Sequence, residues 1–135
     1  MKNNKIRRKI SFAEAINESL LQSMEKNKNL ILMGLGITDP KAIFGTTKNL
    51  LKIFGPNRVI ETPIAEDSIA GISLGMSLNG MYPINTHIRS DFGLLLFNQL
   101  INLAAKYKYM FGGLFEVPCL FRMVIGRSWG QGAQH

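Results

Sequence analysis

Glu66 is the residue of this 135-residue chain whose setting best suits acid–base chemistry. It follows the short apolar stretch Val59-Ile60 and begins a predicted helix, so we expect it at the carboxyl end of a strand, where open parallel sheets bind ligands. A helix N-terminus favours an ionised carboxylate, whereas an apolar setting favours the protonated acid. The setting of Glu66 in the sequence is small and apolar: Ile64, Ala65, Ile69 and Ala70. From the residues alone, the simpler interpretation is that Glu66 only caps the helix and complements its dipole.

A second candidate is the Gly-rich segment at residues 126–135, which follows the last predicted strand and includes Trp129 and His135. Three glycines beside a tryptophan and a histidine indicate a shaped loop, and a flexible tail is the alternative interpretation. The glycine spacing matches no phosphate-binding pattern. With two histidines far apart and a single cysteine, a zinc site is not predicted. His87 is interpreted as a hydrogen-bonded core histidine, because it lies within a predicted buried strand.

The elements that must position these residues alternate along the chain, helix then strand, four times. Ser11 and Glu14 have the spacing of a capping box and open the first helix. Its apolar stripe, which we expect to be buried, consists of Phe12, Ala15, Ile16, Leu20 and Met24.

Further helices are predicted at residues 46–54, 66–79 and 90–109, the last capped by Ser90 or Asp91, and strands at residues 30–33, 58–60, 82–88 and 117–125. Gly71 and Gly75 inside the third helix indicate a close approach of that helix to neighbouring backbone. This alternation predicts an α/β fold, with a parallel sheet flanked by helices on both faces.

The net charge of +7 is concentrated in the first ten residues, which contain five of the 16 basic residues and no acid. We therefore divide the chain into a basic N-terminal arm at residues 1–10 and a single domain at residues 11–135. The domain has 11 basic against 9 acidic residues. No cluster of stacking aromatic residues accompanies the arm, so no nucleic-acid partner is predicted.

The apolar segments are too short to span a membrane, and polar residues such as Glu14 and Asn17 interrupt any signal-peptide core. The single cysteine, Cys119, excludes an internal disulfide and lies in an apolar run, as expected of a buried thiol in a reducing compartment. We therefore expect a cytoplasmic protein without a membrane partner. The chain also ends on a Gly-rich stretch with no closing helix, which we interpret as the mark of a fragment or a truncated product.

Several motifs, in a fixed order, resemble one known family. They are Phe54-Gly55-Pro56-Asn57-Arg58-Val59, Thr62-Pro63-Ile64-Ala65-Glu66, Gly71-Ile72-Ser73-Leu74-Gly75, Asp91-Phe92, Phe97-Asn98-Gln99, Tyr109-Met110-Phe111-Gly112-Gly113 and Gly132-Ala133-Gln134-His135. Over residues 11–135 the chain resembles the pyrimidine-binding domain of the beta subunit of thiamine-diphosphate-dependent 2-oxo acid dehydrogenases. The resemblance implies a transketolase-like fold and oxidative decarboxylation of a 2-oxo acid such as pyruvate.

The resemblance also implies roles for single residues. Glu66 matches the family's glutamate that hydrogen-bonds N1′ of the aminopyrimidine and so promotes loss of the C2 proton of the cofactor, a task that an apolar pocket suits. Phe92 matches the aromatic residue that stacks on the pyrimidine, and Ile64 an apolar contact beside it. His135 matches the active-site histidine that faces the substrate. The main-chain carbonyl of Cys119 matches one ligand of a structural potassium ion in the family, but no metal site is assigned to this chain.

The cofactor that the resemblance implies is thiamine diphosphate with Mg²⁺. These enzymes hold the diphosphate through Mg²⁺ with a Gly-Asp-Gly motif followed by Asn, and the chain has no such motif. The resemblance therefore implies a separate alpha subunit that supplies it, together with a second beta subunit in a heterotetramer and a lipoyl-bearing acyltransferase. We expect the chain to be inactive by itself.

Two features depart from the family pattern. Leu35 follows Gly34 where the family has an acidic residue, so a pyruvate-type substrate is only the default. The C-terminal domain of full family members is also absent. The alternative function is accordingly a truncated, non-catalytic remnant that acts only as an interaction module.

Overall fold

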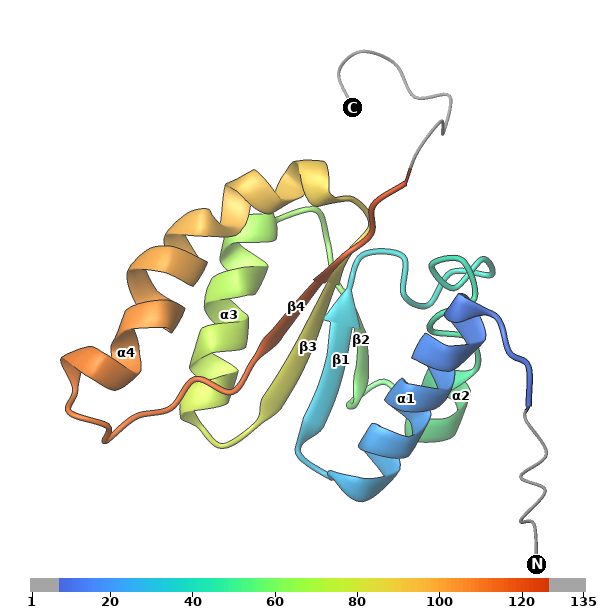
Figure 1. Ribbon diagram of the computed structural model, residues 1–135, viewed down its shortest axis with the longest axis horizontal. Coiled ribbons are helices and arrows are strands. Elements are labelled where there is room, and N and C mark those ends of the chain that lie inside the picture. The colour runs from blue at the N-terminus through green and yellow to red at the C-terminus, as the bar shows by residue number, and fades with distance from the viewer. Residues whose placement is uncertain (1–7, 127–135) are drawn as a thin grey trace, which may run out of the picture.

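The computed structural model describes residues 8–126 of the chain, and its helices and strands follow one another in the predicted order (Figure 1). Most of the basic arm and His135 lie outside the described residues. The elements are α1 (Phe12–Lys26), β1 (Leu30–Gly34), α2 (Leu50–Phe54), β2 (Val59–Glu61), α3 (Glu66–Leu78), β3 (Tyr82–His87), the 3₁₀ helix η1 (Ser90–Leu96), the π-helix η2 (Asn98–Ala104), α4 (Ala105–Met110) and β4 (Leu120–Met123).

The four strands form one parallel sheet in the order β2-β1-β3-β4. Leu32 of β1 lies opposite Val59 of β2 on one side and Ile84 of β3 on the other, so β1 and β3 are the central strands. In Figure 1, α1 and α2 lie to one side of the sheet and α3 and α4 to the other. The predicted α/β class, a parallel sheet flanked by helices on both faces, is confirmed.

Helix α1 begins with the predicted capping box. The backbone N–H of Glu14 donates to Ser11 Oγ (3.2 Å), and the backbone N–H of Ser11 donates to Glu14 Oε2 (2.7 Å). Leu20 and Met24, in the later turns, pack into the main hydrophobic core of the domain. The prediction that Phe12 belongs to the buried stripe is wrong, because the first turn of α1 extends beyond this core and leaves its side chain 84% exposed.

Arg58 joins the end of α1 to the start of β1. Its guanidinium donates to the main-chain carbonyl oxygens of Leu30 (2.8 Å), Asn27 (2.8 Å) and Met24 (3.1 Å). Carbonyl groups at the end of a helix have no partner within the helix, so a side chain that bonds them fixes the turn that follows. Arg58 therefore determines how α1 runs into β1.

We expect Arg58→Met, which keeps the apolar stem and removes all of these donors, to lower the free energy of unfolding by about 2 kcal/mol. Urea titration followed by circular dichroism measures it. The exposed Lys52 on α2 provides the control, because Lys52→Met should change stability by less than about 0.5 kcal/mol. Equal urea midpoints for the two variants would show that the Arg58 hydrogen bonds contribute nothing.

Two predicted helices differ from the observed ones. The helix expected at residues 46–54 is only α2, Leu50–Phe54, because the preceding segment turns repeatedly and Asn49 has a φ of 65°, outside the helical range. The long helix expected at residues 90–109 is divided into η1, η2 and α4, and its N-cap is Arg89 rather than Ser90 or Asp91. Gly93 packs so closely on Met123 that a Cβ there would lie 2.7 Å from the sulfur.

The close approach of α3 to neighbouring backbone, predicted from Gly71 and Gly75, is not found within the described residues. A Cβ at Gly71 would make only ordinary contact with the Gln99 side chain, and one at Gly75 would meet nothing within 4 Å. Neither glycine is therefore required by packing inside the domain. Between residues 8 and 126, no helix has both the length and the apolar character that a membrane span needs.

Candidate functional site

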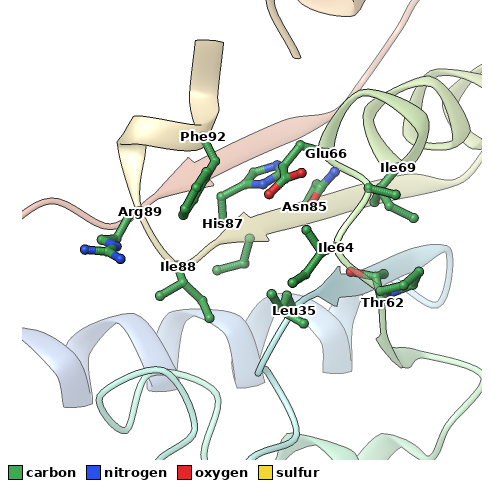
Figure 2. Close-up of a pocket in the computed structure, with 13 residues that line it drawn as sticks. Leu35, Thr62, Ile64, Glu66, Ile69, Asn85, His87, Ile88, Arg89 and Phe92 are labelled. Carbon is green, nitrogen blue, oxygen red and sulfur yellow. The ribbon is translucent and has the colours of Figure 1, made fainter. Parts of the chain in front are cut away.

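A pocket of about 260 Å³ lies where β1, β2 and β3 end, next to the start of α3 (Figure 2). Residues from all of these elements line it. Leu35 directly follows β1, Thr62 directly follows β2, His87 is the last residue of β3, and Glu66 is the first residue of α3. This is the edge of a parallel sheet at which ligands bind.

The loop after β1 is held in place by the Glu61 carboxylate. This group accepts hydrogen bonds from the backbone N–H of Gly36, the backbone N–H of Thr38 (3.0 Å) and Thr38 Oγ1 (2.8 Å). Glu61 is the last residue of β2, so these bonds tie the ends of two neighbouring strands together. As a result, Leu35 is fixed at the wall of the pocket.

Glu66 lies half-buried at the wall of the pocket. In Figure 2 its carboxylate points toward the imidazole of His87, on the side of the pocket where Ile69 also lies. Its neighbour Asp67 instead accepts a hydrogen bond from Gln99 Nε2 (3.1 Å). Glu66 forms no hydrogen bond with any other described residue, and so its side chain does not cap α3 through such a bond. The carboxylate can still complement the helix dipole.

Two buried polar side chains of β3 form the base of the pocket. Asn85 and His87 are two positions apart and therefore point to the same face of the sheet. Asn85 Nδ2 donates to Ser73 Oγ (3.3 Å), but Asn85 Oδ1 and His87 Nε2 have no hydrogen-bond partner among residues 8–126. Buried polar atoms are nearly always paired, so unpaired ones at a pocket wall indicate a place for a ligand or water.

Burial lowers the pKa of His87 below its ordinary value, because desolvation disfavours the charged imidazolium, and the negative charge of Glu66 partly opposes this effect. The histidine is 7% exposed, so the prediction that it is buried is confirmed. The prediction that it is hydrogen-bonded fails for Nε2, because no polar group of the described chain reaches that nitrogen.

Apolar side chains form the mouth of the pocket. Ile64 is 76% exposed and Phe92 is half-buried, and both line it. The Arg89 guanidinium carbon lies 5.8 Å from the centroid of the Phe92 ring, in the range of a cation–π contact. An exposed isoleucine and an aromatic ring beside a carboxylate suit a flat ligand with apolar faces and a polar edge.

The structure thus brings together Glu66, Ile64 and Phe92, the residues to which the resemblance assigned cofactor contacts. Their roles stay predictions. His135 lies outside the described residues. Cys119 immediately precedes β4, at the opposite end of the strands from the pocket, and is half-buried, with its thiol pKa raised by burial and partly lowered again by Ser77.

Asn85 was not predicted to be a pocket residue, and His87 was predicted to lie in the core rather than at a site. The signal was their spacing of two near the end of a strand, which puts both on one face at the ligand-binding edge. No cluster of three histidine, cysteine or acidic side chains able to hold a metal ion is found among residues 8–126.

Comparison with known protein families matches residues 8–135 to the family described as transketolase, pyrimidine binding domain. Among individual proteins, the chain is 36% identical to the beta subunit of the pyruvate dehydrogenase E1 component of Bos taurus, over 93% of this chain and 35% of that protein. It is 35% identical to the beta subunit of acetoin:2,6-dichlorophenolindophenol oxidoreductase of Bacillus subtilis, over 95% of this chain and 41% of that protein.

The relatives extend to plants, since the chain is 34% identical to a pyruvate dehydrogenase E1 beta subunit of Oryza sativa, over 95% of its length. The chain spans between about a third and two fifths of the length of these relatives. The family match covers nearly the whole chain, including the pocket at the ends of the strands. The chain therefore belongs to the transketolase pyrimidine-binding domain family, and its relatives there are beta subunits of the kind that the resemblance indicated.

Proposed function

We propose that the pocket binds the aminopyrimidine ring of thiamine diphosphate and that the chain is the pyrimidine-binding half of a 2-oxo acid dehydrogenase. The observation that carries this proposal is the half-buried Glu66 carboxylate in an otherwise largely apolar pocket at the ends of three parallel strands. An acid in such a setting suits the recognition of a ring nitrogen.

The residues present fit this ring. An aminopyrimidine is flat and has two apolar faces, for which Phe92 and Ile64 are suitable contacts. Its edge has nitrogen atoms that need partners, and Glu66 supplies a carboxyl group there. The unpaired Asn85 Oδ1 is a hydrogen-bond acceptor of the kind that an amino group needs.

In the proposed mechanism, the cofactor would supply a nucleophilic thiazolium carbon and an electron-accepting ring when bound. The chain's own residues orient the pyrimidine ring and polarise it. Glu66 holds a proton at the ring nitrogen, and Phe92 and Ile64 fix the plane of the ring. The buried base formed by Asn85 and His87 keeps bulk water from that side of the pocket.

Dependence on a partner is supported by the surface of η1, η2 and α4. Many large apolar side chains of these elements and of the loop after them are exposed: Leu94, Leu95, Phe97, Ile101, Tyr109, Met110, Phe111, Leu114 and Phe115. Exposed apolar surface on this scale is typical of an interface. The proposed partners are an alpha-type subunit that holds the diphosphate through Mg²⁺, a second beta subunit, and a lipoyl-bearing acyltransferase.

Isothermal titration calorimetry tests the dependence on the alpha subunit. We expect thiamine diphosphate with Mg²⁺ to bind tightly to a mixture of this chain and the alpha-type subunit encoded in the same genome, and at least about 100-fold more weakly to either alone, because each holds only part of the cofactor. Tight binding to the isolated chain would contradict the proposed division of the site. Failure of the mixture to bind would remove the cofactor from the proposal.

The substrate class is tested with the same mixture by following release of carbon dioxide from pyruvate and from branched 2-oxo acids. Turnover of acetoin, named in one relative, in place of every 2-oxo acid would overturn the proposed substrate class. Assembly without binding of cofactor would favour the alternative, an interaction module without catalysis. The cytoplasmic location expected from the sequence stays a prediction.

A further inference from the structure

Among the described residues that line the pocket, Arg89 has the permanent positive charge, and the proposed mechanism gives it no task. Its guanidinium carbon lies 5.8 Å from the centroid of the Phe92 ring, which also lines the pocket. Its Nη1 is buried and has no hydrogen-bond partner among residues 8–126. Buried donors are nearly always paired, so an unpaired guanidinium nitrogen at a pocket wall indicates a place for an acceptor that the described chain does not supply.

The charge of Arg89 also has no counter-ion in the described part of the chain. The two ion pairs found between residues 8 and 126 do not include it. Residues 1–7 and 127–135 contain no aspartate or glutamate. Asp91, two positions further along the chain, is exposed. Because a guanidinium binds carboxylate and phosphate groups in preference to neutral acceptors, the missing acceptor is best supplied by an anionic ligand.

Glu66 is the acid of the same pocket, and it is separate from Arg89. In Figure 2 the two side chains lie well apart, with the Phe92 ring between them in this view. Glu66 therefore stays available for a ring nitrogen, and Arg89 for a second group of opposite charge. A pocket with a separate acid and cation suits two ligands or two parts of one ligand.

The backbone on both sides of Arg89 is fixed to the segment that follows β4. The backbone N–H of Ser90 donates to the carbonyl oxygen of Val124 (3.0 Å), and the backbone N–H of Val124 donates to the carbonyl oxygen of His87 (3.2 Å). Arg89 lies between these two bonds, at the N-cap of η1. A side chain on a fixed backbone loses less conformational freedom when a ligand binds, so Arg89 is well placed for recognition.

We propose that Arg89 binds the carboxylate of the 2-oxo acid substrate. This inference rests on the proposed function, because the substrate class comes from it. A planar guanidinium can donate two parallel hydrogen bonds to a carboxylate, which fixes the orientation of the acid as well as its position. In a 2-oxo acid the carboxylate is attached to the carbonyl carbon, so holding the carboxylate also directs the carbonyl group. Arg89 is thus a specificity-determining residue that selects acids over neutral carbonyl compounds.

The bond between Arg89 and the substrate exists before decarboxylation and is lost as carbon dioxide leaves. It therefore stabilises the bound substrate at least as much as the transition state, and its loss should raise KM rather than lower kcat. In the assembled enzyme we expect Arg89→Gln to raise KM for the 2-oxo acid by about 10-fold to 100-fold, the usual effect of a hydrogen bond to a charged group. We expect kcat to change by less than about 3-fold. Arg89→Lys, which keeps the charge without the planar fork, should restore part of the loss.

The role of charge is tested with inhibitors that share a skeleton and differ in charge: lactate and lactamide when the substrate is pyruvate. Lactate should compete with the substrate and should inhibit Arg89→Gln at least about 10-fold more weakly than the wild type. Lactamide should inhibit both equally. Lys41→Gln is the control for a general change of charge, because Lys41 is exposed in the loop after β1 and does not line the pocket. It should leave KM and lactate inhibition nearly unchanged.

Equal KM values for the wild type and Arg89→Gln would overturn the inference, as would equal weakening of lactate and lactamide. Weaker binding of thiamine diphosphate in the calorimetric titration, with KM unchanged, would also overturn it, because Arg89 would then hold the diphosphate or support Phe92. Failure of the proposed function is seen separately, in the wild type. A wild-type assembly that binds no cofactor or releases no carbon dioxide from any 2-oxo acid would remove the proposed function and this inference with it.

Discussion

Glu66→Gln is expected to slow C2 proton exchange of thiamine diphosphate and turnover of the 2-oxo acid in the assembled enzyme by on the order of 10²–10⁴-fold, the usual contribution of a positioned acid–base group. The amide has nearly the same size as the acid, and Glu66 makes no hydrogen bond with other described residues that the change would break. The fold should therefore be retained. Hydrogen–deuterium exchange at C2, followed by proton NMR after rapid quenching, measures the effect directly.

Asp67→Asn is the control for this experiment as well. Asp67 lies in the same turn of α3 but is exposed and bonds Gln99, so its loss should change the exchange rate by less than about 3-fold. If C2 exchange were as fast in Glu66→Gln as in the wild type, Glu66 would have no role at the ring nitrogen. If both variants lost exchange equally, the effect would arise from the start of α3 as a whole.

Gly34→Ala is expected to be among the most destabilising single substitutions in the chain, at about 3 kcal/mol. Gly34 ends β1 and has a φ of 155°, and a Cβ there would lie 2.2 Å from the carbonyl oxygen of Thr86 on the paired strand. That oxygen belongs to the backbone and cannot rotate away, so the two central strands must separate at the pocket. Chemical denaturation measures the loss.

Gly75→Ala provides the opposite case. Gly75 lies within α3 with nothing within 4 Å of the position of a Cβ, so alanine should raise the stability of the isolated chain by up to about 1 kcal/mol through its higher helix propensity. Similar effects of the two substitutions would show that Gly34 is not constrained by Thr86. We further expect Gly34→Ala, where it still folds, to weaken cofactor binding, because Leu35 and Thr86 both line the pocket.

The sheet and most elements could be predicted because their signals are local. The capping box at Ser11, the apolar run of β1 and the apolar pattern of α3 each depend on neighbouring residues. The region of η1 and η2 could not be predicted in detail, since its geometry depends on contacts such as that of Gly93 with Met123, which is distant in sequence. The predicted burial of Phe12 was also wrong, because helical spacing shows which residues share a face but not where the underlying core ends.

The site shows a similar limit. The place of Glu66 at the start of a helix after a strand made it only a candidate, and the resemblance supplied its predicted role and those of Ile64 and Phe92. The structure places all three in one pocket. That Glu66 and His87 line the same pocket could not be predicted, since they are 21 positions apart on different elements and are brought to it by the packing of α3 on β3. A lone histidine in an apolar strand is more often a satisfied core residue, and only the unpaired Nε2 distinguishes this one.

The most direct test of the central claim is the structure of this chain in complex with its alpha-type subunit, thiamine diphosphate and Mg²⁺. The expected result places the aminopyrimidine ring in the pocket between Ile64 and Phe92, with a Glu66 carboxyl oxygen within about 3 Å of the ring nitrogen. A complex in which the ring binds elsewhere, or in which Glu66 faces solvent beside a bound ring, would contradict the claim that this pocket is the pyrimidine site.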